Sequence, residues 1–224
     1  MRRLQQIGGV AAIIFAIAVA AELALFLIAV PALGSNLNDL NDPDKYAKLL
    51  ARGQAIFVAE GVLFALASAF CFALVRALQE RAGRDSGGLG DTGASFGYAG
   101  YTLLLTAFSL RVFLALDTQH AVQAISGLNI LNTALGAAGG LLIGIWMLLT
   151  AISAVRSATL PRPLTYFTFL SGLALVTSGV LPVPVFIPVF LIWSLWVGAV
   201  LLRQPEVAYS ASQNARQAQA GLPS

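Results

Sequence analysis

The chain has 224 residues, of which 58% are hydrophobic and only 10% are charged, and its mean hydropathy is +0.82. A soluble domain carries about 25% charged residues, so this composition excludes a soluble protein and predicts an all-α, polytopic membrane helix bundle. The formal net charge of +3 is the difference between 13 basic and 10 acidic residues, and the basic residues lie in short segments beside apolar runs. That pattern is typical of charges that orient membrane helices, and it argues against a nucleic-acid partner.

Six apolar segments are long enough, or nearly so, to cross a membrane at about 1.5 Å per helical residue. They are residues 7–30, 55–75, 95–116, 125–155, 164–181 and 183–202. The fourth exceeds the bilayer thickness. The last two are short and joined by Leu181-Pro182-Val183-Pro184, which predicts a tight helical hairpin. Pro188 is expected in the first turn of the last helix, where a missing N–H costs little.

Residues 1–203 are expected to form one six-helix transmembrane domain, followed by a disordered cytoplasmic tail at 204–224 that lacks any apolar run. The first apolar segment is longer than the hydrophobic core of about 7–15 residues in a signal peptide, so it is read as a retained anchor. With the N-terminus inside, nine of the basic residues lie on the inner side and four on the outer side. This bias predicts cytoplasmic N- and C-termini in a multi-pass protein of the inner (cytoplasmic) membrane.

Three charged residues lie alone inside long apolar segments, and the segment order places them at similar depth. At the helical rise, Glu22 lies about 12 Å below the outer surface, and Glu60 and Arg111 lie about 8 Å below it. Asn129 and Asn132 enter from the same side, to about 6–10 Å. The sequence therefore predicts one polar layer near the outer face, to which four helices contribute.

The cost of burying isolated charges predicts that these residues meet. An ionised side chain costs about 2.5–3.5 kcal/mol at the bilayer centre, so three isolated charges cost on the order of 5–9 kcal/mol. Pairing Arg111 with one glutamate, and leaving the other protonated or hydrogen-bonded, is cheaper. Two roles stay open for such a cluster. It holds the helices in register, or it binds a ligand or proton, with Arg111 holding an anionic group and Glu22 or Glu60 carrying the proton.

Gly136, Gly140 and Gly144 form a doubled small-xxx-small pattern on the fourth helix, and Asn132 extends the same face by one turn. Such a stripe allows another backbone to approach closely. The neighbour is either another helix of this chain or a second copy. The expected partners are therefore the lipid bilayer and, as open alternatives, a second copy in a homodimer or the subunits of a larger membrane complex.

The longest outer loop is expected to contain a short amphipathic helix. Asp42 is a good N-cap and is followed by proline, which suits a first helical position. Within 43–52, Tyr46, Leu49 and Leu50 form an apolar face. We expect this helix to lie on the outer membrane surface and to lead into the second spanning helix.

The residues that most enzymes require are missing from the sequence. His120 is the only histidine and Cys71 the only cysteine, so paired haem ligation, an HExxH zinc site, a disulfide and CxxC redox chemistry are excluded. Cys71 is read as a small core residue. Neither a GxSxG nor a P-loop motif occurs. We therefore expect no cofactor, no metal site and no enzymatic activity.

Several short motifs resemble a known family. They are Phe96-Gly97-Tyr98-Ala99-Gly100-Tyr101, Leu160-Pro161-Arg162-Pro163-Leu164, Ile192-Trp193-Ser194-Leu195-Trp196-Val197-Gly198, and the Asp-Pro approach to the second helix. Together they resemble small bacterial six-helix integral membrane proteins that are classified as a domain of unknown function. The likeness extends to about Arg203. It implies the six-helix fold and brings no established activity.

The chain departs from that family at its charged positions. The family tends to carry Arg and Glu in helix three, soon after Gly-Tyr, and Glu beside Trp in helix six. Thr102, Leu105 and Ser194 hold those places here. The function of those charges is therefore either absent from this chain or moved to the layer in the outer half.

Three function classes follow from these observations, of which the third, a membrane-embedded enzyme, is disfavoured by the absent nucleophile and metal sets. The first is a non-enzymatic accessory or structural membrane protein, such as a subunit of a larger complex. It is favoured by few ionisable groups, many small residues and short loops. The alternative is a carrier or binding protein for a small solute, a lipid or a proton, because ionisable clusters inside membranes are often functional.

Overall fold

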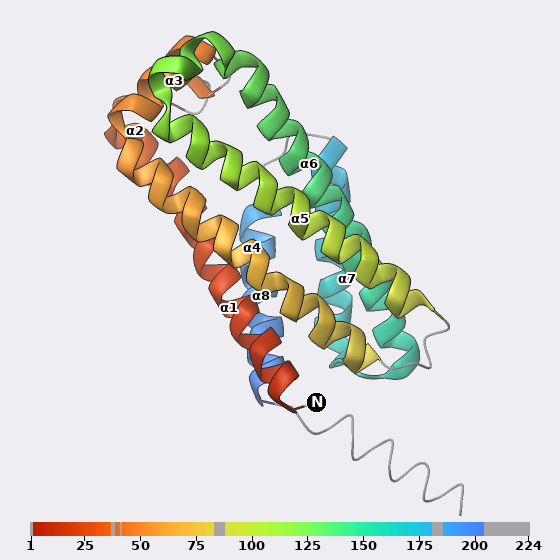
Figure 1. The fold of residues 1–224 in the computed structure, drawn as a ribbon. Helices are drawn as coiled ribbons and strands as arrows, with labels where there is room; N and C mark the ends of the chain where they lie inside the picture. Colours follow the sequence, from red (N-terminus) through yellow and green to blue (C-terminus); the bar gives the residue numbers. More distant parts are fainter. Residues whose placement is uncertain (1, 37–38, 41, 83–87, 181–185, 204–224) are drawn as a thin grey trace, which may run out of the picture.

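In the computed structural model, helices run side by side in one elongated bundle (Figure 1). The structure describes residues 2–36, 39–40, 42–82, 88–180 and 186–203, with the side chains of 2, 82, 118–126, 179–180 and 186 left aside. The helices are α1 (Arg2–Ala24), η1 (Leu25–Ala29), α2 (Val30–Ala32), α3 (Pro43–Arg52), α4 (Gln54–Ala82), α5 (Leu89–Leu116), α6 (Thr118–Ser157), α7 (Arg162–Val180) and α8 (Phe186–Arg203). The predicted tail at 204–224 and the proline-rich link at 181–184 lie outside the described residues.

Four helical stretches are long and apolar enough to cross a membrane. They are Arg3–Ala32, Gln54–Arg81, Leu89–Leu116 and Gly127–Ser157, with mean hydropathies of 1.6 to 2.8. The all-α membrane bundle is thereby confirmed at the level of its class. Within the described residues, α7 and α8 do not reach the same combination of length and hydropathy. Pro188 is the third residue of α8, in its first turn as predicted.

The helices extend beyond the apolar runs that predicted them. α4 continues to Ala82 instead of ending near residue 75, and α5 begins at Leu89 instead of residue 95. Polar side chains support the added turns. Arg76 pairs with Glu80 at 3.2 Å, and Gln79 donates to Asp91 on the neighbouring helix at 2.7 Å. Apolar length marks the part of a helix that suits lipid, whereas good helix formers such as Gln, Glu and Arg carry the helix further.

The first spanning helix widens and then stops around Pro31. The N–H of Val30 donates to the carbonyl of Leu25, five residues back, which defines the π-helical turn η1. Pro31 lacks an N–H and its ring crowds the carbonyl four residues back, so a wider turn before it relieves the conflict. The N–H groups of Gly34 and Ser35 then donate to the carbonyls of Pro31 and Val30, at 2.9 and 3.2 Å. With Gly34 at φ +76°, this is a Schellman stop.

Three helix pairs cross through opposed glycines. In each pair, a Cβ built on one glycine would lie 2.9–3.1 Å from the carbonyl oxygen of the other. The pairs are Gly9 with Gly198 (α1 and α8), Gly100 with Gly139 (α5 and α6), and Gly144 with Gly172 (α6 and α7). Backbones in such contact leave no room for a side chain, so these crossings set the helix spacing.

The predicted glycine stripe on α6 is used only in part. Gly144 packs against α7, but a Cβ built on Gly136 or Gly140 would have no neighbour within 4 Å. Gly139, one position away from Gly140, makes the close contact with α5 instead. The sequence identified the correct helix for close packing. Which of its glycines make the close contacts depends on where α5 and α7 lie.

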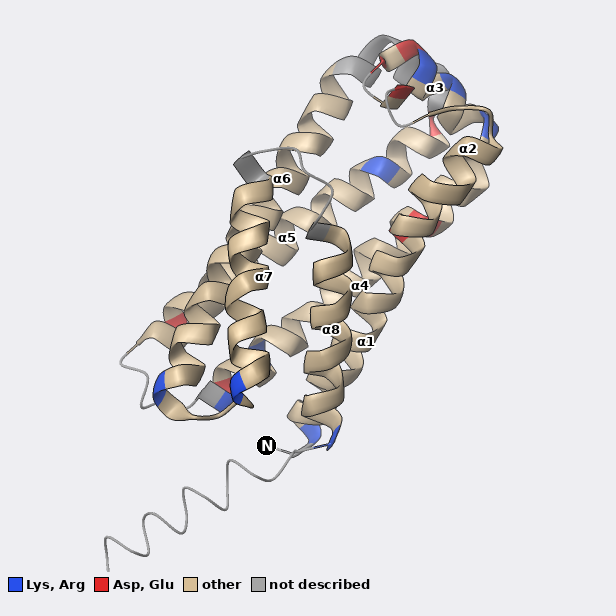
Figure 2. Cartoon of the chain, turned by 180° about the vertical axis from the view of Figure 1, so that it is seen from behind, with Lys and Arg blue, Asp and Glu red and all other residues tan. Residues whose placement is uncertain are grey.

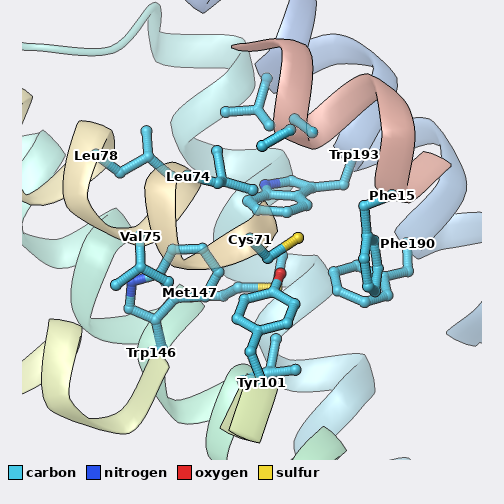
Figure 3. Packing of buried hydrophobic residues seen from close by; sticks show 14 of the residues in the cluster. Phe15, Cys71, Leu74, Val75, Leu78, Tyr101, Trp146, Met147, Phe190 and Trp193 are labelled. Atoms are coloured by element: carbon cyan, nitrogen blue, oxygen red, sulfur yellow. The ribbon is translucent and has the colours of Figure 1, made fainter. Parts of the chain in front are cut away.

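A closed ring of aromatic side chains forms the centre of the core (Figure 3). Neighbouring ring centroids around it are 5.2–5.8 Å apart. Its members are Phe15, Tyr101, Trp146, Trp193 and Phe190. Cys71 is fully buried beside this ring, which confirms its reading as a core residue.

The two ends of the bundle differ in thickness. In Figures 1 and 2, α7 and α8 stop short of the end that carries α3. The start of α1 and the end of α8 lie together at the opposite end, where Gly9 contacts Leu202. Charged residues gather at the two ends, with few between them (Figure 2). Fewer helices therefore lie side by side at the α3 end, and the isolated charges lie within this part of the bundle.

Candidate charge triad beneath α3

Glu22, Glu60 and Arg111 meet inside the bundle, and we refer to them as the charge triad. Glu22 comes from α1, Glu60 from α4 and Arg111 from α5. One nitrogen of the arginine, Nη1, donates to both oxygens of Glu22 at 3.1 Å and to Oε2 of Glu60 at 3.0 Å. The expected meeting of the three charges is therefore present in the structure. Whether it serves binding or register is a separate question.

The triad is buried between apolar layers. Glu22 and Glu60 are 8% and 6% exposed. On the side of the core, Cζ of Arg111 lies 4.6 Å from the centroid of the Phe108 ring, and this ring stacks on Phe64 at 3.9 Å. A guanidinium over an aromatic face gains a favourable electrostatic contact that grows as water is excluded. The surroundings thus favour charge pairing over hydration.

α3 covers the other side of the triad. Asp42 caps this helix, and its carboxylate accepts from the N–H groups of Asp44 and Lys45 at 3.1 and 3.2 Å. The apolar residues of α3 are buried in one cluster with residues of η1, α4 and α5. Its buried members are Leu25, Val30, Tyr46, Ala47, Leu49, Leu50, Phe57, Leu114 and Ala115. A helix of the protein therefore covers the triad on this side, and we refer to α3 as the roof of the triad.

The predicted placement of this apolar face needs a correction. The helix has the expected bounds, but Tyr46, Leu49 and Leu50 face the end of the bundle instead of the membrane surface. The bundle end offers an apolar surface that includes Leu114 and Phe57, and packing there buries both partners. An amphipathic pattern alone does not distinguish a lipid surface from a protein surface.

Tyr46 is the residue of α3 whose pKa is affected by the charges of the triad. Burial raises the pKa of its phenol, Arg111 acts in the opposite direction, and Glu22 and Glu60 add to the rise. Its sequence signal was only its place on an apolar helix face, so its proximity to the charges was not foreseen.

The segment before α3 is held by polar contacts. Lys45 pairs with Asp39 at 3.0 Å, and the backbone N–H of Asn36 donates to the same aspartate at 2.9 Å. Asn129 of α6 donates to the carbonyl of Leu40 at 3.4 Å. The roof is thus tied both to its own loop and to α6.

Neither predicted asparagine contacts Arg111 in the described structure. Asn129 is engaged with the loop before α3, as above. Asn132 is 9% exposed, and its Oδ1 has no hydrogen-bond partner among the described residues. The polar layer of the sequence analysis therefore divides into a triad on α1, α4 and α5 and separate amides on α6.

The charges of the triad do not balance when all three groups are ionised. Two carboxylates face one guanidinium, which leaves one negative charge in a buried site. Glu22 uses both oxygens to accept from Arg111, whereas Glu60 uses only Oε2. The other oxygen, Oε1, is buried and has no hydrogen-bond partner among the described residues. An unpaired charge in such surroundings is costly, and neutralisation by a proton is the usual remedy.

An apolar groove lies beside Glu60, between the first spanning helix and α4. It encloses about 400 Å³. Apart from Glu60, its lining is aliphatic, and the residues are Ala21, Ala24, Leu25, Ile28, Ala29, Ile56, Ala59 and Leu63. The turn η1 forms part of this wall, so the widening of the helix before Pro31 shapes the groove.

A second buried charge lies at the opposite end of the bundle. Arg81 is 7% exposed, and its Nε donates to the carbonyl of Thr159 at 2.9 Å, while its Nη1 has no partner among the described residues. Arg81 is one of the nine basic residues that were expected on the inner side from the sequence. Its burial depends on the position of the connection between α6 and α7, which the periodicity of apolar residues does not predict.

In comparisons with known proteins, no family model matches the chain, and no curated protein or solved structure matches it either. The geometry of the triad is therefore the basis for any functional statement.

Proposed function

We propose that this protein is a non-enzymatic integral membrane protein, an accessory or structural subunit whose charge triad fastens three helices together. In this proposal the chain crosses the inner membrane six times, with both termini in the cytoplasm and α3 on the outer side. The proposal includes its place among the small bacterial six-helix membrane proteins that its motifs resemble. The four long apolar helices and the contact between the start of α1 and the end of α8 support this arrangement.

The observation that carries the proposal is the sharing of a single arginine nitrogen by two helices. Arg111 of α5 donates from Nη1 to Glu22 of α1 and to Glu60 of α4. Breaking a buried pair by removing one partner costs about 3–5 kcal/mol, because the remaining charge stays buried without compensation. A contact of that strength beneath a packed helix is suited to holding helices in register.

Variants of the triad test the fastening role. We expect Arg111→Ala to lower the free energy of unfolding in detergent by about 3–5 kcal/mol, because two carboxylates would lose their donor. The matched control is Arg76→Ala, which removes an exposed pair with Glu80 and should cost less than about 1 kcal/mol. Equal, small losses in both variants would contradict the fastening role.

The accessory role is tested by gentle extraction from native membranes, followed by native mass spectrometry. A co-purifying protein in fixed ratio is expected if the chain is a subunit. Recovery of the chain alone, or as a homodimer that carries a small molecule, would contradict the accessory role and favour the second candidate.

A carrier or binding protein for a small solute, lipid or proton is the second candidate. The groove of about 400 Å³ beside Glu60 favours it, since aliphatic walls of this kind suit an acyl chain. Filling the groove by Ala59→Leu should release a bound lipid from the purified protein, while Val62→Leu, outside the groove, should retain it. Equal lipid content in the wild type and both variants, measured by native mass spectrometry, would contradict lipid binding in this groove.

A further inference from the structure

We infer that the charge triad is a proton-binding site, in which Glu60 holds one exchangeable proton beside the Glu22–Arg111 pair. The inference rests on the proposed placement of the triad within the membrane. It deepens the proposed function by naming the ligand that completes the fastening contact.

Charge balance supplies the first argument. Arg111 neutralises one carboxylate, and the second would leave a net negative charge between the Phe108 layer and the roof formed by α3. Transfer of one proton from a hydronium ion of the solvent forms one carboxylic O–H bond, breaks one O–H bond of the hydronium and leaves a water molecule. The triad then becomes electrically neutral while all three donations from Arg111 are kept.

Hydrogen-bond geometry selects the residue that carries the proton. Both oxygens of Glu22 already accept from Arg111 Nη1, so a hydrogen on either would compete with this donor for the lone pairs of that oxygen. Glu60 Oε1 is buried and accepts from no group in the described part of the chain, so it can carry an O–H without disturbing the arginine.

The other groups around Glu60 do not supply a competing charge. α1 contributes Glu22 and α5 contributes Arg111. The charged residues of α3, which are Asp44, Lys45, Lys48 and Arg52, are exposed. The buried polar residue of α3 is Tyr46, whose phenol is neutral because burial raises its pKa. Among the residues of α6 whose side chains are described, the polar ones at this end are Asn129, Asn132 and Thr133, and all are neutral. The only charged residues in the described parts of α7 and α8, Arg162 and Arg203, lie at the opposite end of the bundle.

A proton suits the site better than a metal cation. Ca²⁺ takes 6–8 oxygen ligands and Mg²⁺ demands an octahedral set. Here Arg111 already occupies three of the four carboxylate oxygens. One remaining oxygen is sufficient for a proton and insufficient for such ions.

Infrared difference spectroscopy of the purified full-length protein tests this inference. At neutral pH we expect the carbonyl stretch of one protonated carboxylic acid, shifted in heavy water and lost in Glu60→Gln. The matched control is Glu80→Gln, which alters an exposed ion pair at the inner end and should retain the band. Absence of an acid carbonyl in the wild type, or its persistence in Glu60→Gln, would overturn the inference.

A second measurement avoids dependence on the variant. The chain has four glutamates, Glu22, Glu60, Glu80 and Glu206. In wild-type protein labelled with ¹³C-carboxyl glutamate, one of the four carbons should resonate at the protonated position at neutral pH. Four ionised signals would overturn the inference even if Glu60→Gln failed to fold.

The outcomes separate this inference from the proposed function. Four ionised glutamates together with a destabilised Arg111→Ala would exclude the proton and leave the fastening role in place. One protonated glutamate together with an unaffected Arg111→Ala would keep the proton site and remove the fastening role.

Discussion

Three arginines show how differently this bundle accommodates the same side chain. Arg76 is exposed and pairs with Glu80 on its own helix, an arrangement worth about 0.3–0.5 kcal/mol. Arg81 is buried with a single carbonyl acceptor for its Nε. Arg111 is partly buried, with its side chain 15% exposed, and it pairs with carboxylates from two other helices. The number of chain segments that each arginine joins, more than its exposure, sets its importance for the fold.

Asp39 and Lys45 form the contact whose pH dependence is easiest to isolate. The pKa of Asp39 is lowered by the backbone N–H of Asn36 and then by Lys45, and the pKa of Lys45 is raised by Asp39. For a lowered carboxyl pKa, the stabilisation is present above the unfolded value of about 3.9 and is lost as pH falls through the folded value. For Lys45, it is present below the unfolded value of about 10.4 and is lost as pH rises through the folded value.

Acidification should therefore loosen the loop before α3. We expect amide protection in residues 42–45, corrected for the intrinsic exchange rate, to fall as pH drops below about 4. Asp39→Asn should show weaker protection already at neutral pH and a smaller acid-dependent loss. A wild-type protection that stays constant down to pH 2 would contradict the prediction.

At the scale of helices, the cap and bounds of α3 were predictable, whereas the ends of α4 and α5 and the face that each helix presents were not. α3 begins and ends at the predicted residues because Asp42 caps it and Gly53 follows it. The ends of α4 and α5 were placed too near the apolar runs, because hydropathy reports the lipid-facing length only. The face that each helix presents depends on its neighbours. For the apolar side of α3 and the glycines of α6, the sequence identified the correct helices but not the residues that these faces contact.

Two glycines on α6 provide a matched test of helix crossing. Gly144→Ala places a Cβ 2.9 Å from the Gly172 carbonyl, so we expect a loss of about 1–3 kcal/mol in unfolding free energy. Gly140→Ala meets no atom within 4 Å and should be neutral or stabilising by up to about 1 kcal/mol, because alanine favours the helix. Unfolding of both variants in detergent checks the difference. A larger loss in Gly140→Ala would indicate a neighbour, such as a second copy, on that face.

The cap of α3 can be separated from its packing. Asp42→Ala removes the acceptor for the N–H groups of Asp44 and Lys45 and should destabilise α3 by about 1 kcal/mol. Asp42→Asn should restore most of this loss, because asparagine caps about as well as aspartate. Hydrogen exchange within α3 is the measurement. An unchanged α3 in Asp42→Ala would show that contacts with the bundle alone determine this helix.

At the scale of the whole molecule, the sequence predicted a charged layer near the α3 end, and the structure brings three of its five residues into contact. Glu22, Glu60 and Arg111 could be predicted because each is the lone charge of an apolar segment. The roof by α3, the groove and the burial of Arg81 could not be predicted. Each depends on segments that are distant in the chain and have no charge or motif in common.

Orientation is tested by cysteine labelling in intact cells. Cys71 is fully buried, so the wild type should give little background. Lys48→Cys, exposed on α3, should react with an impermeant maleimide from outside, whereas Arg156→Cys, exposed at the far end of α6, should react only after permeabilisation. The reverse pattern would place α3 in the cytoplasm.

The contact between Gly9 and Gly198 has a consequence for biogenesis. These residues belong to α1 and α8, the earliest and latest of the described helices to leave the ribosome. At about 5–20 residues per second, roughly 190 residues of synthesis separate them by about 10–40 s. α1 can dock on α4 during that interval, but the face of α1 around Gly9 stays open to lipid until α8 arrives. Closure of the aromatic ring around Phe15, Phe190 and Trp193 is therefore among the last steps of insertion, so a nascent chain that stalls before α8 would present an unfinished helix surface to membrane quality control.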